Sequence, residues 1–408
     1  MYLYFFLVRL AALLGNKKAR LLIQGQKDCL AELQQVSDKG LIAHSEKEQL
    51  IWFHAASVGE FEQARPIIER LRSEHKSCKI LLTFFSPSGY EMRKNYDKVN
   101  RVLYLPFATR RNAKLFLDAV RPDMAIFSKY EFWPAYLKEL KRRSIPTYSI
   151  CAIFRKSQLF FMPWGRPYLN LLKCFTHIFV QDRDSLNLLQ RHGITECSVA
   201  GDTRFDRVHA IKEQGKNIPL LKEFCGAGPV IVAGSSWPAD EALLARYMEE
   251  HEEVRLVLVP HEINEEHLHT IFQTFLGRYV RYTEATKESI TQCRILVVDT
   301  MGMLSSLYRY ATVAYIGGGF GVGIHNTLEA AVYGIPVLFG PNYKKFREAK
   351  GLIAAGASTS VKNYRQLAAA LDEALMLHKE KGEMATQYVE SELGATERIY
   401  QALGFGNN

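Results

Sequence analysis

The sequence predicts an α/β protein made of two Rossmann-like, doubly wound domains. Short apolar strand patterns alternate with amphipathic helical patterns along the chain, which is typical of a parallel sheet covered by helices. The alternation stops once, at the polar segment 211–226, and then restarts. With 408 residues, the chain exceeds the size at which a single hydrophobic core stops growing, so two domains are expected.

The first domain is expected at residues 26–210. Its apolar runs are rich in β-branched and aromatic residues and are separated by helical patterns. Ligands of such sheets bind beyond the carboxyl ends of the strands, so residues that follow a strand are the first candidates for function. The expected strands are IWFHAAS (51–57), KILLTFF (79–85), VLYLP (102–106), MAIFS (124–128), PTYSICA (146–152), HIFVQ (177–181) and SVAG (198–201).

The second domain is expected at residues 227–390, after a linker at 211–226. The last segment, 391–408, contains the helical pattern ATERIYQALGF and is predicted to pack back on the body of the protein. Two doubly wound domains of similar size are expected to face each other across a cleft. The expected strands of the second domain are PVIVAGS (229–235), RLVLVP (255–260), RILVVD (294–299), TVAYIGG (312–318) and PVLFG (336–340).

Residues 1–25 are predicted to form a membrane-associated helix. The first residues, MYLYFFLVRLAALLG, are apolar except for Arg9, and the basic segment NKKAR follows them. A bilayer span needs roughly 20 apolar residues, and this run is shorter. We therefore expect the helix to lie in the membrane surface, with the basic segment on anionic lipid. A helix packed on the body of the protein and a single span are the alternatives.

Composition narrows the class of protein without deciding its partner. The net charge of +9 favours an acidic partner, and nucleic acid, phospholipid headgroups and a phosphorylated substrate all meet that description. The seven cysteines are scattered, which indicates neither a metal knuckle nor a disulfide framework and fits a reducing cytosol.

A glycine-rich segment in the second domain predicts a nucleotide site. A strand runs into five glycines, whose missing side chains let backbone amides approach a ligand closely. A helix is expected to start near 325–327 and to aim free N–H groups at a phosphate, with Glu329 placed to accept hydrogen bonds from ribose hydroxyls. The dinucleotide fingerprint and the G-x-x-x-x-G-K-[ST] loop are both missing from the sequence, so a nucleotide-activated sugar is the expected ligand. The glycines are Gly317, Gly318, Gly319, Gly321 and Gly323.

Five segments carry a resemblance to a known family. They are HAASVGE (54–60), KYEFWP (129–134), GDTRFD (201–206), DTMG (299–302) and HNTLEAAVYGIPVLFGP (325–341), in this order over essentially the whole chain. In these segments the chain resembles the 3-deoxy-D-manno-octulosonic acid (Kdo) transferases of lipopolysaccharide assembly. The resemblance implies a glycosyltransferase B fold, CMP-Kdo as donor, the lipid A precursor lipid IVA as acceptor, and inversion at the anomeric carbon.

The resemblance also implies where the protein works. It places the chain on the cytoplasmic face of the inner membrane of a Gram-negative bacterium, as a monomer that binds no nucleic acid. We expect no catalytic metal or other cofactor, because helix N-termini and cations can stabilise a monophosphate leaving group. Asp182-Arg183-Asp184 matches the D-x-D pattern of metal-dependent glycosyltransferases, but the helical run that follows favours helix capping.

Three residues are expected to carry the catalysis. Glu60 follows a strand at a helix start, where the helix dipole favours the ionised carboxylate of a general base, and the family's proton acceptor matches this position. Glu131 matches a glutamate of the family's catalytic site, although a helix N-terminal residue is the ordinary interpretation. Arg204 matches a position usually held by a lysine that stabilises negative charge. His54, inside an apolar strand, is expected to be a hydrogen-bonded core residue.

Donor contacts are expected after several strands of the second domain. Gly234, Ser235 and Ser236 follow its first strand and form a second candidate phosphate loop. Two positions depart from the family: His261 stands where an arginine is common, and Met303 stands where a glutamate is common. The CMP contacts that carry over from the family are Pro260, His261, Met301, Gly302, Met303, Asn326, Thr327, Leu328 and Glu329.

The acceptor site is expected on the first domain. Ser86, Ser88 and Gly89 follow a strand and can donate hydrogen bonds to a sugar or phosphate, or can form only a turn. Arg155 and Lys156 precede the apolar segment LFFMPW, which suits a phosphorylated acylated sugar, a membrane-facing loop or buried core.

Two other classes of function stay open on the sequence. A UDP-sugar-dependent transferase or epimerase of the same fold would use the same nucleotide loop. A non-catalytic, membrane-associated sugar-binding protein would keep both domains without needing Glu60.

Overall fold

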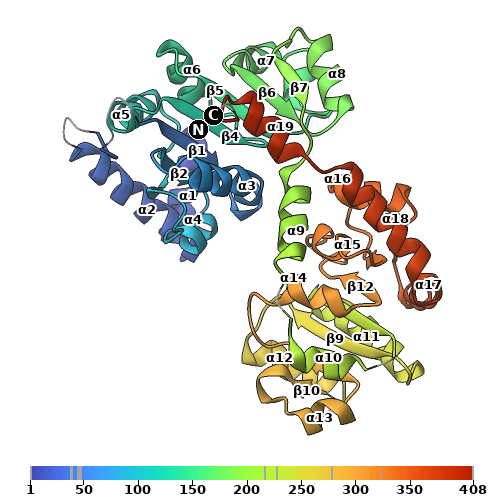
Figure 1. Cartoon of the computed structure of the whole chain (residues 1–408). Coiled ribbons are helices and arrows are strands. Elements are labelled where there is room, and N and C mark those ends of the chain that lie inside the picture. Colours follow the sequence, from blue (N-terminus) through green and yellow to red (C-terminus); the bar gives the residue numbers. More distant parts are fainter. Residues whose placement is uncertain are drawn as a thin grey trace. The chain divides into compact units, whose positions relative to one another are not determined.

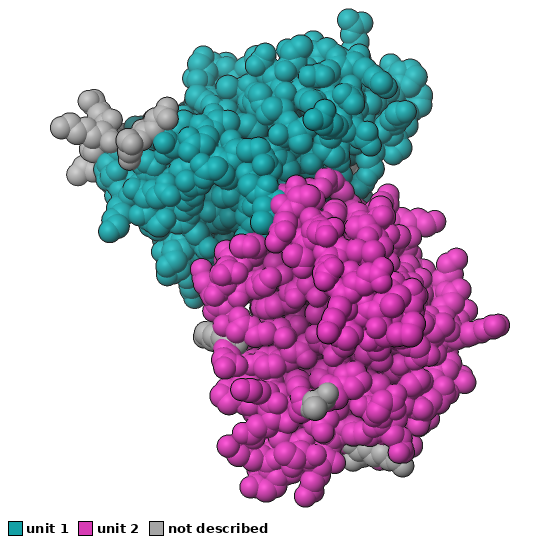
Figure 2. All heavy atoms as spheres, turned by 45° about the vertical axis from the view of Figure 1, so that its right-hand side comes forward, with its two compact units in different colours: residues 1–206, 393–408 teal, residues 207–392 magenta. Residues whose placement is uncertain are grey.

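The chain folds into two compact units, each with its own parallel sheet (Figure 1). The computed structural model describes residues 2–36, 40–43, 48–215, 217–226, 228–276, 279–321 and 323–406. Unit 1 comprises residues 1–206 and 393–408, and unit 2 comprises residues 207–392, coloured teal and magenta in Figure 2. The division at Asp206 precedes the predicted boundary at residue 210.

Unit 1 is built on a seven-stranded sheet in the order β3-β2-β1-β4-β5-β6-β7, with every pairing parallel. The strand order reverses between β1 and β4, so their carboxyl ends flank the topological switch point where doubly wound sheets bind ligands. All seven predicted strands are confirmed, with ends shifted by at most two residues. The strands are β1 (Leu50–Ala55), β2 (Lys79–Phe84), β3 (Arg101–Tyr104), β4 (Met124–Ser128), β5 (Thr147–Ala152), β6 (His177–Val180) and β7 (Cys197–Val199).

Helices cover both faces of this sheet, and the central strand β1 is therefore buried along its whole length. Trp52 packs on Phe116 and Tyr136 on one side of β1, while Phe53 and Phe61 belong to the core on the other side. The helices are α3 (Val58–Glu74), α4 (Pro87–Arg93), α5 (Arg110–Val120), α6 (Pro134–Arg142), η1 (Leu159–Phe161), α7 (Arg166–Leu172), α8 (Arg183–Arg191) and the unit-spanning α9 (Thr203–Glu213).

The N-terminal segment forms two helices, where the sequence predicted one helix over 1–25. Helix α1 (Tyr2–Leu13) ends before Gly15, whose φ of +95° an L side chain rarely adopts. Asn16 then caps α2 (Lys17–Gln34) by accepting a hydrogen bond from the Ala19 amide, so the basic segment opens a new helix. Among the helices of the described residues, none combines the length and the apolar composition that a membrane span requires.

The C-terminal segment packs on unit 1. Helix α19 (Ala395–Ala402) lies against α3, with Ile399 and Tyr400 buried in the same core cluster as Phe61. The Asp206 carboxylate accepts hydrogen bonds from the Gly394 and Thr396 amides at the start of α19, 2.7 and 2.6 Å long.

Unit 2 contains a second seven-stranded parallel sheet, in the order β10-β11-β9-β8-β12-β13-β14, which reverses between β8 and β12. The five predicted strands are confirmed. The two edge strands β10 and β14 were not predicted, because they have only two and three residues and lack an apolar run. The strands are β8 (Val230–Ser236), β9 (Arg255–Pro260), β10 (Val280–Arg281), β11 (Ile295–Val297), β12 (Val313–Ile316), β13 (Val337–Phe339) and β14 (Ser358–Ser360).

Helical structure occupies most of the described part of the predicted linker 211–226. Helix α10 buries Leu221 and Phe224 in unit 2, so this polar-looking segment is part of the unit. The helices of unit 2 are α10 (Pro219–Cys225), α11 (Pro238–Glu250), α12 (Glu265–Thr274), η2 (Tyr282–Glu284), α13 (Lys287–Gln292), α14 (Leu304–Leu307), η3 (Tyr308–Tyr310), α15 (Leu328–Ala331), α16 (Arg347–Ala354), α17 (Tyr364–Met376) and α18 (His378–Ser391).

Candidate active site

Glu60 lies in the first turn of α3, directly after β1 at the switch point of unit 1. The half-buried side chain accepts a hydrogen bond from the hydroxyl of Ser57, the N-cap residue of the helix. A hydroxyl donor and the positive end of the helix dipole thus both face this carboxylate, a position that suits a general base.

Glu131 follows β4 on the other side of the switch point and is buried. Its Oε2 atom accepts hydrogen bonds from His54 Nε2, 3.1 Å away, and from Trp133 Nε1, 2.6 Å away. His54 is itself fully buried in β1, as a core residue was expected to be. The histidine also fixes the orientation of Glu131, and this role was missed by the sequence analysis.

A chain of hydrogen bonds behind Glu131 holds the ring of His54. Trp52 Nε1 can only donate, and its acceptor is Thr83 Oγ1 at 2.8 Å. The Thr83 hydroxyl lies 2.8 Å from His54 Nδ1. His54 Nδ1 also lies 3.1 Å from the Thr83 carbonyl oxygen, while Nε2, on the other side of the ring, faces Glu131.

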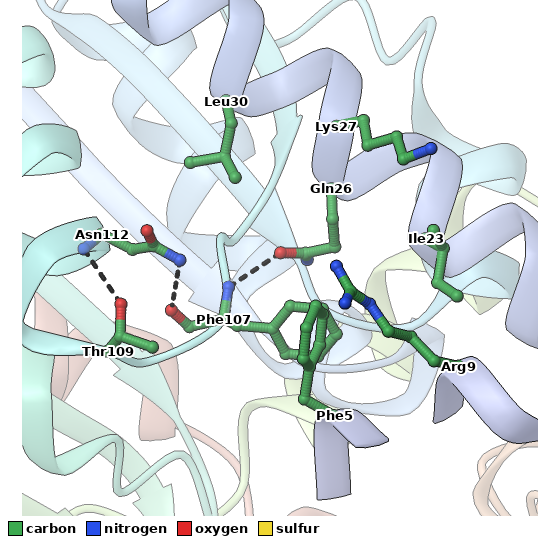
Figure 3. A pocket seen from close by; sticks show the side chains of 9 residues that line it. All are labelled: Phe5, Arg9, Ile23, Gln26, Lys27, Leu30, Phe107, Thr109 and Asn112. Atoms are coloured by element: carbon green, nitrogen blue, oxygen red, sulfur yellow. Dashed lines mark hydrogen bonds between the residues drawn. The ribbon is translucent and has the colours of Figure 1, made fainter. Parts of the chain in front are cut away.

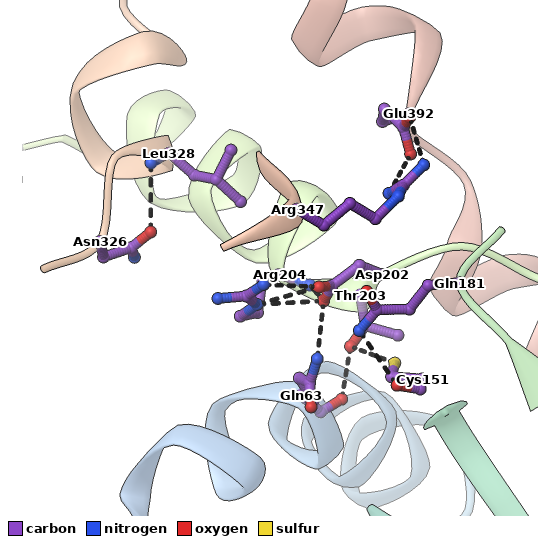
Figure 4. A network of polar contacts seen from close by, with 10 residues as sticks. All are labelled: Gln63, Cys151, Gln181, Asp202, Thr203, Arg204, Asn326, Leu328, Arg347 and Glu392. Atoms are coloured by element: carbon purple, nitrogen blue, oxygen red, sulfur yellow. Dashed lines mark hydrogen bonds and ion pairs between the residues drawn. The ribbon is translucent and has the colours of Figure 1, made fainter. Parts of the chain in front are cut away.

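Arg204 is held by Asp202 at the start of α9 (Figure 4). Its Nε and Nη2 atoms lie 3.0 and 2.7 Å from Asp202 Oδ2. Burial raises the pKa of Asp202, but the charge and hydrogen bonds of Arg204 outweigh it and hold the pKa below its ordinary value. Asp202 also accepts a 3.2 Å hydrogen bond from Gln63, one turn after Glu60 on α3. The cation is thus tied to the helix that carries the predicted base.

Tyr130 brings three of the predicted residues together. Burial raises the pKa of the Tyr130 hydroxyl, and the charges of Arg155, Glu60 and Arg204 all act on the same group. These residues follow β4, β5, β1 and β7, so four strand ends of unit 1 converge on one site. The preceding residue, Lys129, has a φ of +60°, a conformation that concentrates at functional sites. Tyr130 was missed because its motif was attributed to Glu131.

The serine motif after β2 caps a helix. Ser86 is the N-cap of α4, and its hydroxyl accepts a 3.1 Å hydrogen bond from the Gly89 amide. A Cβ at Gly89 would lie 2.6 Å from the Phe84 ring, so close packing requires the glycine. The acceptor role of Ser86, Ser88 and Gly89 stays a prediction.

The LFFMPW segment is divided between core and surface. Phe160 and Phe161 pack edge-on against Phe154, whereas Trp164 is 70% exposed. The nearby Asp182 accepts a 2.7 Å hydrogen bond from the Ser185 amide and caps α8, as the capping interpretation of the D-x-D pattern expected. No group of three or more His, Cys, Asp or Glu side chains suited to a metal occurs among the described residues.

In unit 2, the glycine-rich segment follows β12 at the second switch point, but backbone packing explains much of it. A Cβ at Gly317 would lie 2.2 Å from the carbonyl oxygen of Ser235, and one at Gly319 would lie 2.6 Å from the backbone of Gly340. Packing against a neighbouring strand end therefore explains the missing side chains at these two positions, and the role of the loop in ligand binding stays a prediction.

Most backbone amides of the glycine-rich loop already donate hydrogen bonds to other groups of unit 2. The Gly318 amide donates a 2.9 Å hydrogen bond to the buried Asp240, and the Gly317 amide donates to the Gly234 carbonyl group. The Gly321 and Gly323 amides both donate to the Gly318 carbonyl group. These four amides are bonded to the protein, so the predicted cradle for phosphate is smaller than expected.

The helix after the loop starts close to its predicted position but has only one turn. Helix α15 (Leu328–Ala331) ends before Gly334, whose φ of +70° turns the chain toward β13. Asn326 Oδ1 accepts from the Leu328 amide, and Asn326 Nδ2 donates to Glu329 Oε1 at 3.0 Å. Thr327 is buried between them. Asn326 and Glu329 thus form one rigid polar pair, part of which is drawn in Figure 4.

His261 lies in a stack of rings at the same edge of the sheet. Its ring lies 4.9 Å from that of Trp237 and 4.4 Å from that of His325. Burial and the neighbouring His261 lower the pKa of His325 to about 4. Trp237 Nε1 donates to His325 Nε2 at 3.4 Å, which requires that nitrogen to be unprotonated. Neutral aromatic surface therefore stands beside the position where the family commonly has an arginine.

The remaining predicted donor residues differ in accessibility. Ser236 is buried and donates to Glu241 Oε1 at 2.8 Å, while Ser235 is half-buried with a φ of +53°. Met301 is 78% exposed, and nothing lies within 4 Å of a Cβ built on Gly302. The neighbouring strands β8 and β12 bring Gly234 beside the glycine-rich segment. Pro260 is the last residue of β9, and Met303 directly precedes α14.

Comparison with known sequences supports the resemblance. Residues 34–207 match the family model described as 3-deoxy-D-manno-octulosonic-acid transferase (kdotransferase). The 3-deoxy-D-manno-octulosonic acid transferase of Aquifex aeolicus is 29% identical over 337 residues, covering 81% of this chain and 87% of the relative. The transferase of the same name from Bordetella pertussis is 27% identical over 381 residues and covers 86% of each chain.

Comparison with solved structures shows the fold. UDP-GlcNAc 2-epimerase from Neisseria meningitidis, bound to UDP-GlcNAc, matches with a TM-score of 0.61 at 16% identity, covering 87% of this chain and 99% of the other. MurG of Acinetobacter baumannii matches with a TM-score of 0.55 at 12% identity, over 88% and 99%. The predicted glycosyltransferase B fold is thereby confirmed. The chain is similar in sequence to the 3-deoxy-D-manno-octulosonic acid transferases over most of its length.

Proposed function

We propose that the protein transfers Kdo from CMP-Kdo to lipid IVA, the phosphorylated and acylated precursor of lipid A, with inversion at the anomeric carbon. The observation that carries this proposal is the convergence of Glu60, Arg155 and Arg204 on Tyr130, beside the hydrogen-bonded Glu131. A carboxylate and two cations that act on one site are what a glycosyl transfer with an anionic leaving group requires.

Glu60 acts as the general base. The acceptor hydroxyl attacks the anomeric carbon, its proton passes to the Glu60 carboxylate, and the bond from that carbon to the phosphate oxygen breaks with CMP as the leaving group. Arg204 stabilises the negative charge that develops on the phosphate, while Asp202 fixes the direction of the guanidinium. With this cation present, the mechanism does not require a metal.

Glu131 stabilises the positive charge that develops on the sugar ring. Its carboxylate is held by His54 and Trp133, so it needs no reorganisation when the charge appears. A buried, ionised Glu131 can do this only while its hydrogen-bond donors are in place.

The donor nucleotide binds unit 2. The support is the position of Asn326, Glu329, Ser235 and the His261 stack at the switch point of the second sheet. The carboxylate of Glu329 can accept hydrogen bonds from ribose, and the ring of His261 offers a face or an N–H group to the nucleotide. CMP, tested against UDP at equal concentration, should produce the larger rise in the thermal unfolding midpoint. Stabilisation by UDP alone would favour a UDP-sugar enzyme.

The protein works at the cytoplasmic face of the inner membrane. The support is the α1–α2 pair, which exposes Phe6, Leu7, Leu10 and Leu13 and carries the basic residues Lys17 and Lys18. Such a surface binds the boundary of an anionic bilayer.

The decisive experiment replaces Glu60 by glutamine and analyses the lipid product by mass spectrometry. Removal of a general base should lower kcat by roughly 10²–10⁴-fold, with CMP binding unchanged. Glu74→Gln, at the exposed end of the same helix, is the matched control and should retain activity. Full Kdo transfer by Glu60→Gln would contradict the mechanism, and a lipid product without added Kdo from the unsubstituted protein would contradict the proposed function.

A further inference from the structure

A cavity of about 230 Å³ lies between the two N-terminal helices and the segment after β3 (Figure 3). Its apolar wall is formed by Phe5 of α1, Ile23 and Leu30 of α2, and Phe107. The volume is below the roughly 300–1,000 Å³ typical of pockets that hold a whole ligand. The cavity therefore suits one apolar chain end.

The polar side chains in the wall of this cavity are already bonded to the protein. Gln26 accepts a 2.8 Å hydrogen bond from the Phe107 amide and donates another of 2.8 Å to the Leu105 carbonyl group. Asn112 donates a 3.0 Å hydrogen bond to the Phe107 carbonyl group. Because Gln26 and Asn112 are bonded in this way, the cavity offers a bound molecule mainly apolar contact. Arg9 and Lys27 also line it, and the Arg9 guanidinium lies 4.2 Å from the centre of the Phe5 ring.

A wider, basic groove of about 910 Å³ adjoins the cavity, and Thr109 lines both. Four cations of α5 and α6 line the groove and make no ion pair with any residue that the structure describes. The acidic member of the groove, Glu139, is bound by Arg142 and Arg143, which lower its pKa to about 2. A net positive groove beside an apolar cavity is complementary to a phosphorylated lipid. The four cations are Arg110, Arg111, Lys114 and Lys138.

A row of aromatic rings connects the cavity with the candidate active site. The Phe5 ring lies 4.6 Å from Phe107, which lies 5.8 Å from Phe85. Phe85 lies 4.7 Å from Trp133, whose indole nitrogen donates to Glu131. The groove also begins at Pro134, three residues after Glu131. This continuity argues for the acceptor rather than a lipid of the surrounding bilayer, since only the acceptor must reach the catalytic carboxylates.

We propose that one acyl chain of the acceptor enters the cavity between α1 and α2 while an acceptor phosphate binds the Arg110–Lys138 groove. This inference rests on the proposed Kdo transfer to a phosphorylated, acylated acceptor. It makes the α1–α2 pair part of the substrate site, so that the pair sets the acceptor's chain requirement as well as contacting the membrane.

The cavity is tested by filling it. Leu30→Trp, and Ile23→Trp as a second variant, should raise KM for tetraacylated lipid IVA by roughly tenfold with kcat retained, since each buried methylene is worth about a factor of four in affinity. KM for the O- and N-deacylated disaccharide bisphosphate should not change, which also shows that the variants are folded. Met376→Trp, exposed on α17, is the matched control.

The role of the groove in phosphate binding is tested by removing positive charges from it. Lys114→Gln/Lys138→Gln should reduce the preference for the bisphosphorylated acceptor over its dephosphorylated form, whereas the control Lys76→Gln/Lys350→Gln, with the same loss of charge, should keep it. Equal KM values for acylated acceptor in Leu30→Trp and Met376→Trp would overturn the inference. So would loss of binding to phosphatidylglycerol vesicles without a change in KM, because the cavity would then hold bilayer lipid. If the unsubstituted protein transfers Kdo in these assays, the proposed function survives either result.

Discussion

At the scale of single residues, the central feature is the hydrogen-bond chain that orients Glu131. It starts at Trp52, passes through Thr83 and His54, and ends at the carboxylate. A carboxylate in a buried site keeps its charge only when donors compensate for the lost water. The contact from His54 Nε2 is therefore as important to Glu131 as the position of the glutamate itself.

Replacing Thr83 by valine should damage this chain without changing the shape of the core. The variant leaves Trp52 Nε1 without its acceptor, and we expect a loss of about 1–3 kcal/mol in the free energy of unfolding. His54 loses the hydroxyl partner of its Nδ1 atom, so kcat should fall while KM for CMP-Kdo stays unchanged. Urea unfolding and steady-state kinetics measure the two effects. Thr83→Ser keeps the hydroxyl and should retain kcat, and equal kcat values for the serine and valine variants would contradict the role of the chain.

Stability should depend on pH through His325. Its pKa is lowered to about 4 in the folded protein from an ordinary value of 6.5, so between these pH values the unfolded chain binds a proton that the folded chain does not. Stability from this group is thus complete above pH 6.5 and is lost as pH falls toward 4. Urea unfolding at several pH values should show the original protein losing stability relative to His325→Gln on acidification. A pH-independent difference would refute the prediction.

The sequence located the ends of the strands, and with them Glu60 and Glu131, because apolar runs and helix starts are local patterns. It did not reveal Thr83 or Tyr130. Thr83 lies opposite His54 in the register of β1 and β2, and this pairing depends on how two distant segments align. Tyr130 gains its neighbours from three further strand ends. Such contacts arise from sheet order, which the local pattern does not contain.

At the scale of elements, the glycine-rich segment after β12 allows close packing of strand ends, a role that its composition did not reveal. Gly317 and Gly319 allow the ends of β8, β12 and β13 to approach closely. Glycine is needed both where a loop contacts a ligand and where strand ends pack closely together. The composition of the segment therefore could not show which of the two structures it forms. The same limit applies to α15, where the sequence placed the helix start correctly but gave no measure of its single-turn length.

Gly317→Ala should destabilise unit 2. The added Cβ would lie 2.2 Å from the Ser235 carbonyl oxygen, a backbone atom that cannot rotate away. We expect a loss of about 1–3 kcal/mol or more in the free energy of unfolding, as for other overpacked sites. Gly321→Ala is the control in the same loop, because its nearest neighbour would lie 4.0 Å away, and it should stay within about 0.5 kcal/mol. Equal stability of the two variants in urea would show that the backbone around Ser235 can move to accommodate the added methyl group.

At the scale of the whole molecule, the chain crosses between its units twice, so sequence order and physical unit do not coincide. Residues 393–408 follow unit 2 in the sequence but belong to unit 1. Ile399, Tyr400 and Leu403 are buried against α3, and Asp206 binds the first amides of α19. The end of the chain thus supports α3, the helix that carries the predicted base Glu60.

Truncation after Glu392 should therefore destabilise the unit that lies earlier in the sequence. Each lost apolar side chain contributes about 1.5–3 kcal/mol of burial, and Asp206 would lose both amide partners. Hydrogen exchange measured by mass spectrometry should show faster exchange in peptides of α3 and β1, with the β8 and β12 peptides of unit 2 unchanged. Removal of residues 407–408 alone is the control and should leave both patterns as they are. Faster exchange confined to unit 2 would contradict the assignment of residues 393–408 to unit 1. The expected pattern would instead explain how a deletion more than three hundred residues after Glu60 could abolish the proposed catalysis by this residue.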